Sequence, residues 1–172
     1  MVFVRKIVQA DAPAVLAAFH SDPDMKRQGN VSTLEEARRY IRQFTESDSM
    51  DAWVVDCDGR AVGLVGVSFD RENRNGWFFY WMSAEYRGRG WMSIAARTIA
   101  NWSLSEGGME RLELGYRVNN SQSAFVAHAA GFIREGLERS KFLVNGVRID
   151  VETCGRLVDD PWPEGRCVDL YV

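Results

Sequence analysis

The segment that decides the fold is Tyr86-Arg87-Gly88-Arg89-Gly90-Trp91-Met92. It follows an apolar, strand-like run at 76–83 and precedes a segment with apolar residues at helical spacing, which ends at Gly107-Gly108. Glycines between a strand and a helix let backbone N–H groups converge on one point, and the helix N-terminus adds unpaired donors. The segment therefore predicts an anion-binding turn, and the plain alternative is a tight turn with solvated arginines.

The common nucleotide-binding motifs do not match this turn. Gly88 and Gly90 are followed by Ser93 where a dinucleotide fingerprint has its third glycine, and the Gly-Lys-Ser/Thr sequence of a P-loop is absent. A nucleotide-binding module of another class is therefore a poor interpretation of this chain.

Further strands and helices are expected on both sides of the turn. The patterns predict strands at 2–8, 52–56, 61–69, 76–83, 111–118, 138–144 and 147–157, and helices at 11–19, 33–44, 92–106 and 121–130. Because the unit from Gly76 to Val118 is strand-helix-strand, its two strands should be parallel neighbours. The fold class is α/β with a mixed sheet, helices on both faces and the order β-α-α-β-β-β-α-β-α-β-β.

Length and composition narrow the possible functions. A chain of 172 residues predicts one domain, 1–158, followed by a tail at 159–172 that leaves the core. The 21 Lys and Arg against 24 Asp and Glu argue against a nucleic-acid partner. Two His and three widely spaced Cys argue against a metal site and fit reduced thiols in the cytoplasm. The longest apolar runs are about six residues, so no membrane partner is expected.

Two motifs at the right separation then resemble one known family. Arg87, Gly90 and Met92 fall on the defining positions of the Arg/Gln-x-x-Gly-x-Gly/Ala pyrophosphate loop of the GNAT superfamily of N-acetyltransferases. Asn120 and Ser123, followed by Gly131-Phe132, resemble the Rim-type branch, which acetylates protein N-termini and, in relatives, small amines. The resemblance covers about 2–157. Met92 departs from the usual Gly or Ala, and we expect its larger side chain to crowd the pyrophosphate.

The resemblance implies acetyl-CoA as cosubstrate and no metal. In this family the strand before the loop splays from its neighbour, its exposed backbone binds the pantetheine arm, and one N–H polarises the thioester carbonyl. Carried over to this chain, the cofactor-binding residues are Trp81, Met82, Arg87, Gly88, Arg89, Gly90, Trp91, Met92, Ser93 and Asn120. Four of the six Trp lie between Trp77 and Trp102, so acetyl-CoA should change the tryptophan fluorescence.

The catalytic assignments are carried over in the same way. The tyrosine acid of many family members is replaced here by Ala127, so the acid role passes to Ser123. Glu113 is the first candidate for the base, Glu85 is the second, and water is the alternative to both.

The resemblance implies transfer of an acetyl group to a primary amine, in a protein or peptide N-terminus or in a small molecule, by direct attack in a ternary complex. A non-catalytic acyl-CoA-binding or sensory domain is the alternative function. Residues 25–30 and the closing hairpin are expected to select the acceptor, and the family makes a homodimer plausible.

Overall fold

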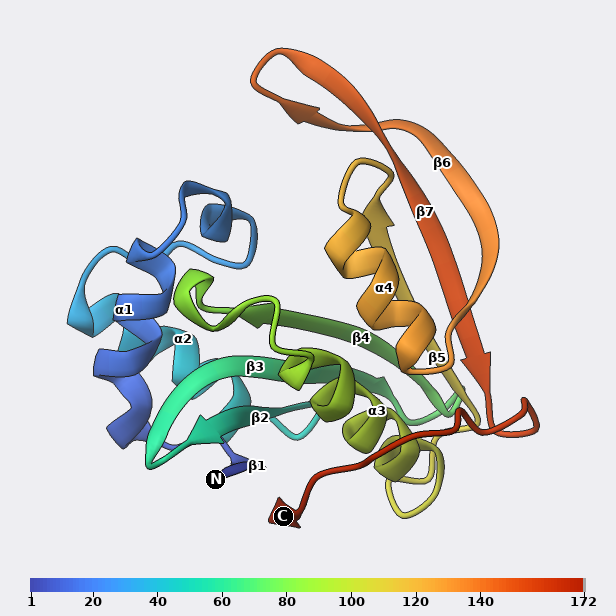
Figure 1. Cartoon of the computed structure of the whole chain (residues 1–172), viewed down its shortest axis with the longest axis horizontal. Helices are drawn as coiled ribbons and strands as arrows, with labels where there is room; N and C mark the ends of the chain where they lie inside the picture. The colour runs from blue at the N-terminus through green and yellow to red at the C-terminus, as the bar shows by residue number, and fades with distance from the viewer. Residues whose placement is uncertain (172) are drawn as a thin grey trace.

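One eight-stranded sheet organises residues 1–171, the part of the chain that the computed structural model describes (Figure 1). The strand order is β6-β7-β5-β4-β3-β2-β1-β8. The strands are β1 (Val2–Lys6), β2 (Met50–Cys57), β3 (Arg60–Asp70), β4 (Asn75–Met82), β5 (Arg111–Arg117), β6 (Ile133–Val144), β7 (Val147–Leu157) and β8 (Leu170–Tyr171). The helices are α1 (Ala12–His20), α2 (Leu34–Thr45), α3 (Trp91–Leu104) and α4 (Ser121–Ala129), with 3-10 turns η1 (Gln9–Asp11), η2 (Pro23–Arg27) and η3 (Ala84–Tyr86).

Local sequence signals account for several element ends. At the two predicted hairpin turns, Asp58-Gly59 and Asn145-Gly146, both central residues have positive φ, as a type I′ turn requires. At the start of α2, the Thr33 hydroxyl accepts from the Glu36 N–H at 3.2 Å, and the Glu36 carboxylate accepts from the Thr33 N–H at 3.1 Å. This reciprocal pair satisfies two N–H groups that a helix start leaves free.

Helices cover both faces of the sheet, as the patterns predict. On one face, α3 and α4 enclose a core that includes Val4, Trp53, Val55, Val65, Val67, Phe78, Ala95, Ile99, Leu112, Leu114 and Phe132. On the other, α1 and α2 enclose Val15, Phe19, Ala37, Tyr40, Ile41, Phe44, Val54, Leu64 and Trp81. Full burial of one such large side chain contributes about 1.5–3 kcal/mol, so the two cores fix the sheet between its helices. None of the helices in residues 1–171 is both long and apolar enough to span a bilayer.

The sheet opens between its two central parallel strands. β4 and β5 pair only where Asn75–Trp77 face Arg111–Glu113, which confirms the expected parallel neighbours. Beyond Trp77 the strands separate, and Figure 1 shows them diverging from this common start. We call the space between them the split.

The C-terminal segment differs from the sequence-based prediction. Residues 159–172 were expected to leave the core, but the described part returns along α3 and ends as β8, which pairs with β1 (Figure 1). The Val168 N–H donates to the Thr98 hydroxyl at 3.1 Å, and the Trp162 ring covers the buried Arg156 guanidinium at 5.2 Å. Residues 133–137 also belong to β6, which begins earlier than expected.

Candidate active site

The edge of β4 that faces the split presents free main-chain groups. The Ser83 N–H donates to the Val62 carbonyl at 2.9 Å, which makes this residue pair a hydrogen-bonded one in the antiparallel β3–β4 ladder. Because such pairs alternate along a ladder, the Trp81 main chain also faces β3, whereas the N–H groups of Tyr80 and Met82 face the split. The site therefore offers backbone donors to an extended ligand that enters as an added strand.

The loop at 86–92 lies directly beyond this edge, and we call it the phosphate loop after its predicted ligand. Gly88 and Gly90 have φ values of 76° and 74°, and no heavy atom lies within 4 Å of the position that a Cβ would occupy at either residue. Gly90 is the N-cap of α3, so the N–H groups of 91–93 lack partners within the helix. Open space in front of free donors at a helix N-terminus forms a cradle for an anion.

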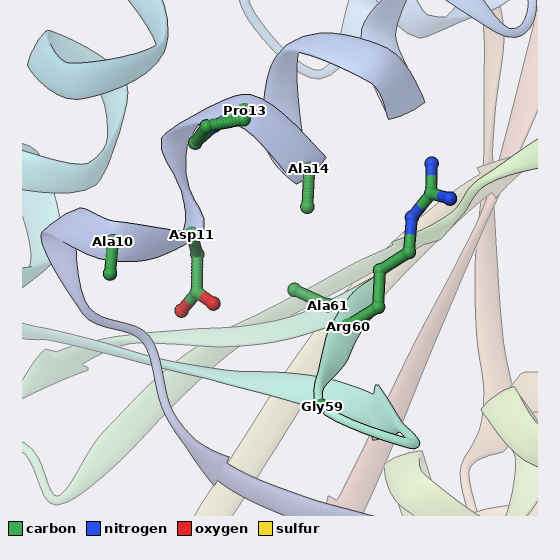
Figure 2. A pocket seen from close by; sticks show the side chains of 7 residues that line it. All are labelled: Ala10, Asp11, Pro13, Ala14, Gly59, Arg60 and Ala61. Atoms are coloured by element: carbon green, nitrogen blue, oxygen red, sulfur yellow. The ribbon is translucent and has the colours of Figure 1, made fainter.

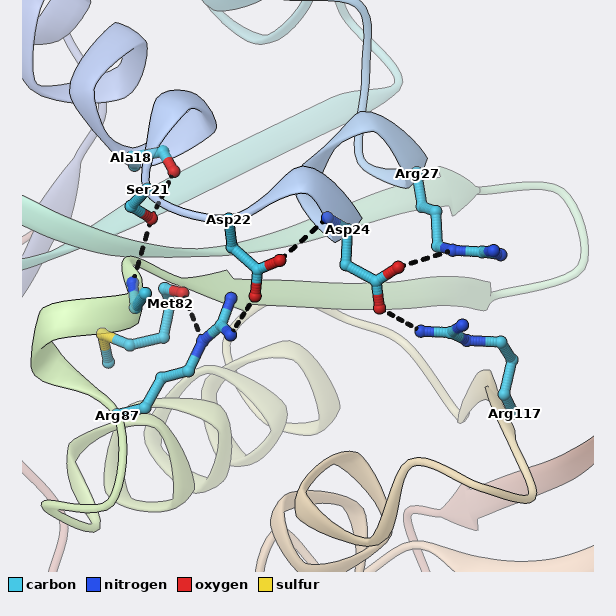
Figure 3. A network of polar contacts seen from close by, with 9 residues as sticks. Ala18, Ser21, Asp22, Asp24, Arg27, Met82, Arg87 and Arg117 are labelled. Atoms are coloured by element: carbon cyan, nitrogen blue, oxygen red, sulfur yellow. Dashed lines mark hydrogen bonds and ion pairs between the residues drawn. The ribbon is translucent and has the colours of Figure 1, made fainter. Parts of the chain in front are cut away.

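The two arginines of this loop have different surroundings. The Arg89 guanidinium lies 5.2 Å from the Tyr86 ring and 5.0 Å from the Trp91 ring, and within residues 1–171 it forms no ion pair. Its charge is therefore available to an anion at the loop. Arg87 instead pairs with Asp22, and its Nε donates to the Met82 carbonyl at 3.0 Å (Figure 3).

Arg87 thus joins the cofactor side of the site to the segment that follows α1. The Asp22 carboxylate also accepts from the Asp24 N–H at 2.8 Å, and this bond, together with Arg87, lowers the pKa of Asp22. The guanidinium of Arg87 already binds Asp22 and the Met82 carbonyl. Only the main chain of Arg87 therefore remains for the predicted contact with acetyl-CoA. No local signal in the sequence indicated a partner 65 residues away.

Two other predicted cofactor residues have buried side chains. Trp81 packs on the α1 and α2 side, where its Nε1 donates to the Tyr40 hydroxyl at 3.0 Å. Met92 packs into the core under α3, so the expectation that it crowds the pyrophosphate is wrong. Ser93 is buried as well. For Met92 and Ser93 the cofactor-binding prediction therefore rests on the backbone alone, whereas the main chain of Trp81 pairs with β3 and its side chain with Tyr40, so its position argues against contact with the cofactor.

At the open end of the split, α4 places the predicted acid beside β4. The side-chain Oδ1 of Asn120 accepts from the Ser123 N–H at 3.0 Å and so caps the helix. The Tyr80 hydroxyl lies 2.8 Å from the Ser123 carbonyl oxygen and 3.0 Å from its Oγ. Nothing near Tyr80 in the sequence indicates a role for its side chain, because its partner lies 43 residues further along the chain.

Glu113, the predicted base, lies elsewhere. It pairs with Trp77 at the closed end of the split, and its carboxylate accepts from Arg111 Nε at 2.7 Å. Its side chain points to the face opposite Leu112 and Leu114, which pack under α3. No hydrogen bond joins it to Ser123. Glu113 as base stays a prediction, and its position argues against contact with an amine at the open end.

The carboxylates in and before η2, the segment predicted to select the acceptor, are paired with arginines. Asp24 of η2 accepts from Arg117 of β5 at 2.6 Å and from Arg27 at 3.3 Å, as Figure 3 shows. The Arg117 contact lowers the pKa of Asp24. This bridge holds η2 against the end of β5, so the segment predicted to select the acceptor has a fixed position beside the split.

One hollow in the surface lies away from the split. It measures about 280 Å³ and is lined by residues between η1, the start of α1 and the β2–β3 turn, which are Ala10, Asp11, Pro13, Ala14, Gly59, Arg60 and Ala61 (Figure 2). Asp11 there receives two hydrogen bonds from Arg5 at 2.8 and 2.9 Å. Within residues 1–171, no group of three or more His, Cys, Asp and Glu could hold a metal ion.

Comparisons with known proteins agree with this geometry. The family model of the acetyltransferase (GNAT) domain matches residues 2–133. The ribosomal-protein-serine acetyltransferase of Escherichia coli is 32% identical over 144 residues, which cover 81% of this chain and 73% of that protein. YdaF of Bacillus subtilis is 28% identical over 111 residues, and the match spans 64% of this chain but only 60% of that protein.

A solved structure supports the fold. The ribosomal L7/L12 alpha-N-protein acetyltransferase RimL in complex with coenzyme A superposes with a TM-score of 0.83 at 20% identity, covering 92% of this chain and 94% of that one. The family match spans most of the chain and includes β4, the phosphate loop and α4. The chain therefore belongs to the GNAT family of acetyl-CoA-dependent N-acetyltransferases.

Proposed function

We propose that this chain transfers the acetyl group of acetyl-CoA to the α-amine of a protein N-terminus, by direct attack while both substrates are bound. The observation that supports this most strongly is the split itself. It combines an unpaired β4 edge, an open glycine cradle at the N-terminus of α3 and the Ser123 hydroxyl at its open end.

The residues present fit acetyl-CoA, which supplies an acetyl group activated as a thioester. The N–H groups of the phosphate loop and the Arg89 side chain would hold the pyrophosphate. The side-chain Oδ1 of Asn120 accepts from the Ser123 N–H, which leaves the side-chain NH₂ for the pantetheine arm. The Met82 N–H faces the split, where it can stabilise negative charge on the thioester oxygen.

Two proton roles follow from the same geometry. Ser123 takes the acid role through a hydrogen bond: its hydroxyl lies at the open end of the split and can donate to the leaving sulfur, which takes its proton from solvent. For the base, the position of Glu113 favours the alternative of water, which can take the proton of the amine at the open end. No covalent enzyme intermediate is needed, which agrees with the scarcity of His and Cys.

Charge pairing on the acceptor side favours an α-amine over a polyamine. A polyamine needs several unpaired carboxylates, but Asp22 and Asp24 are each paired with an arginine. The names of several relatives refer to ribosomal proteins, which supports a peptide acceptor. A cytoplasmic location and a homodimer stay predictions from the sequence.

Thiol release tests this proposal. The protein is mixed with acetyl-CoA and short peptides that begin with Ser or Ala, the residues named in two relatives. We expect release with free N-termini, none with the same peptides blocked at the α-amine, and less with spermidine. Release with spermidine alone would overturn the acceptor class, and binding of acetyl-CoA without any release would favour the non-catalytic alternative.

A further inference from the structure

Tyr80 is a half-buried residue beside the split, and the transfer reaction assigns no task to its hydroxyl. Its side chain leaves β4 on the α3 and α4 face, two residues before Met82. The Tyr80 Oη contacts two oxygens of one residue, the carbonyl of Ser123 at 2.8 Å and the Ser123 Oγ at 3.0 Å. A structural tyrosine needs one acceptor, so a second contact on the predicted acid suggests a further task.

The number of protons fixes the resting arrangement. Each of the two hydroxyls has one proton, and a backbone carbonyl can only accept. With the Tyr80 O–H donating to the Ser123 carbonyl, the Ser123 O–H donates to the Tyr80 oxygen. If the Ser123 O–H rotates to donate to a ligand in the split, the Tyr80 O–H can leave the Ser123 carbonyl and donate to Ser123 Oγ instead. A hydroxyl that accepts a hydrogen bond becomes a stronger donor.

We propose that Tyr80 is a positioning residue for Ser123, whose hydroxyl it turns toward the leaving thiolate and strengthens as a donor. This inference rests on the proposed function. As the amine nitrogen bonds to the carbonyl carbon, the C–S bond breaks and its electron pair stays on sulfur. The proton of the amine passes to water. Both hydroxyl protons stay on their oxygens and stabilise the thiolate through hydrogen bonds, and the sulfur takes its proton from solvent.

The surroundings of Tyr80 agree with a hydroxyl that keeps its proton. Burial raises the pKa of Tyr80 above its usual range, and the Cys154 thiol acts in the same direction. Asn120 fixes the position of Ser123, because its side chain caps α4 and holds the first turn of this helix. The pair is therefore neutral and placed by two separate elements before any ligand binds.

Kinetics on four variants tests whether Tyr80 acts through Ser123. We expect Tyr80→Phe to lower kcat about tenfold with little change in the KM for acetyl-CoA, and Ser123→Ala to lower it at least as much. The double variant should be no slower than Ser123→Ala. Tyr116→Phe is the matched control, because this buried tyrosine donates to Glu152 at 2.8 Å and does not touch Ser123. It should retain kcat within about twofold.

A binding measurement gives a readout that does not depend on turnover. A thiol ionises near pH 8.5, so the affinity for CoA should rise between pH 7 and 9.5, whereas that for desulfo-CoA should not. We expect Tyr80→Phe and Ser123→Ala each to remove most of this rise, and Tyr116→Phe to keep it.

Three results would overturn the role of Tyr80. These are an unchanged kcat in Tyr80→Phe, losses that multiply in the double variant, and a pH-dependent rise in CoA affinity that survives in Tyr80→Phe. If the wild-type protein released no thiol with any amine, the proposed function would fail. The comparison of CoA with desulfo-CoA would still decide the inference.

Discussion

Gly90→Ala changes the anion cradle. Its effect on the stability of the free protein can be measured separately from its effect on acetyl-CoA binding. Gly90 has a φ of 74° and caps α3, and an added Cβ would meet no protein atom within 4 Å. The methyl group therefore creates backbone strain but no clash with the protein. It would extend into open space at the loop, beside the helix start where we place the pyrophosphate.

The magnitudes follow from the backbone geometry. An alanine in the left-handed region costs about 1–2 kcal/mol. For a chain of this length, each kcal/mol lowers Tm by about 2–4 °C, so Gly90→Ala should lower it by about 2–8 °C without ligand. Acetyl-CoA at 100 times its Kd should stabilise the wild-type protein by about 2.7 kcal/mol. A tenfold loss of affinity would reduce this stabilisation to about 1.4 kcal/mol, so the ligand-induced rise in Tm should halve or fall further.

Gly59→Ala is the matched control for this experiment. Gly59 has a φ of 84°, and an added Cβ there also meets nothing within 4 Å, but the residue lies in the β2–β3 turn. Both variants should lose similar stability without ligand, and only Gly90→Ala should lose the response to acetyl-CoA. Thermal unfolding with and without acetyl-CoA measures both quantities. Equal ligand-induced rises in the two variants would refute the placement of the pyrophosphate at Gly90.

Three further predictions concern other parts of the molecule. Asp22→Asn should weaken acetyl-CoA binding about threefold or more by calorimetry, because Arg87 loses the partner that holds it on β4; an unchanged Kd would contradict this coupling. Deletion of 159–172 should lower the free energy of unfolding by roughly 3 kcal/mol, because the contacts of this segment with α3 and Arg156 are lost. Denaturant unfolding measures this quantity, and a loss below about 1 kcal/mol would contradict the prediction. Trp91→Phe should remove most of the fluorescence change on acetyl-CoA binding, and a full change in this variant would show that another tryptophan reports it.

Features set by neighbouring residues were predictable from the sequence. The capping box at Thr33, the hairpin turns and the glycine loop at Gly88 and Gly90 each depend on backbone geometry within a few residues. The parallel pairing of β4 and β5 followed from the handedness of a strand-helix-strand unit. Together these were enough to predict where the cofactor binds.

Features set by distant partners were not predictable. Arg87 matched the family motif, but its ion pair with Asp22 depends on how η2 packs against the loop. Tyr80 looked like one aromatic residue of an apolar strand, and only the fold brings it to Ser123. Glu113 was the first candidate for the base, but the sequence pattern does not tell how far along the split a residue lies.

The split between β4 and β5 as the acetyl-CoA site is the central claim, and amide hydrogen exchange tests it most directly. With saturating acetyl-CoA we predict slower exchange at the end of β4 and in the phosphate loop, residues 80–93, relative to the free protein. The β2–β3 turn at 57–61, which borders the hollow beside η1, should exchange at the same rate in both states. Protection at 57–61 with none at 80–93 would contradict the claim.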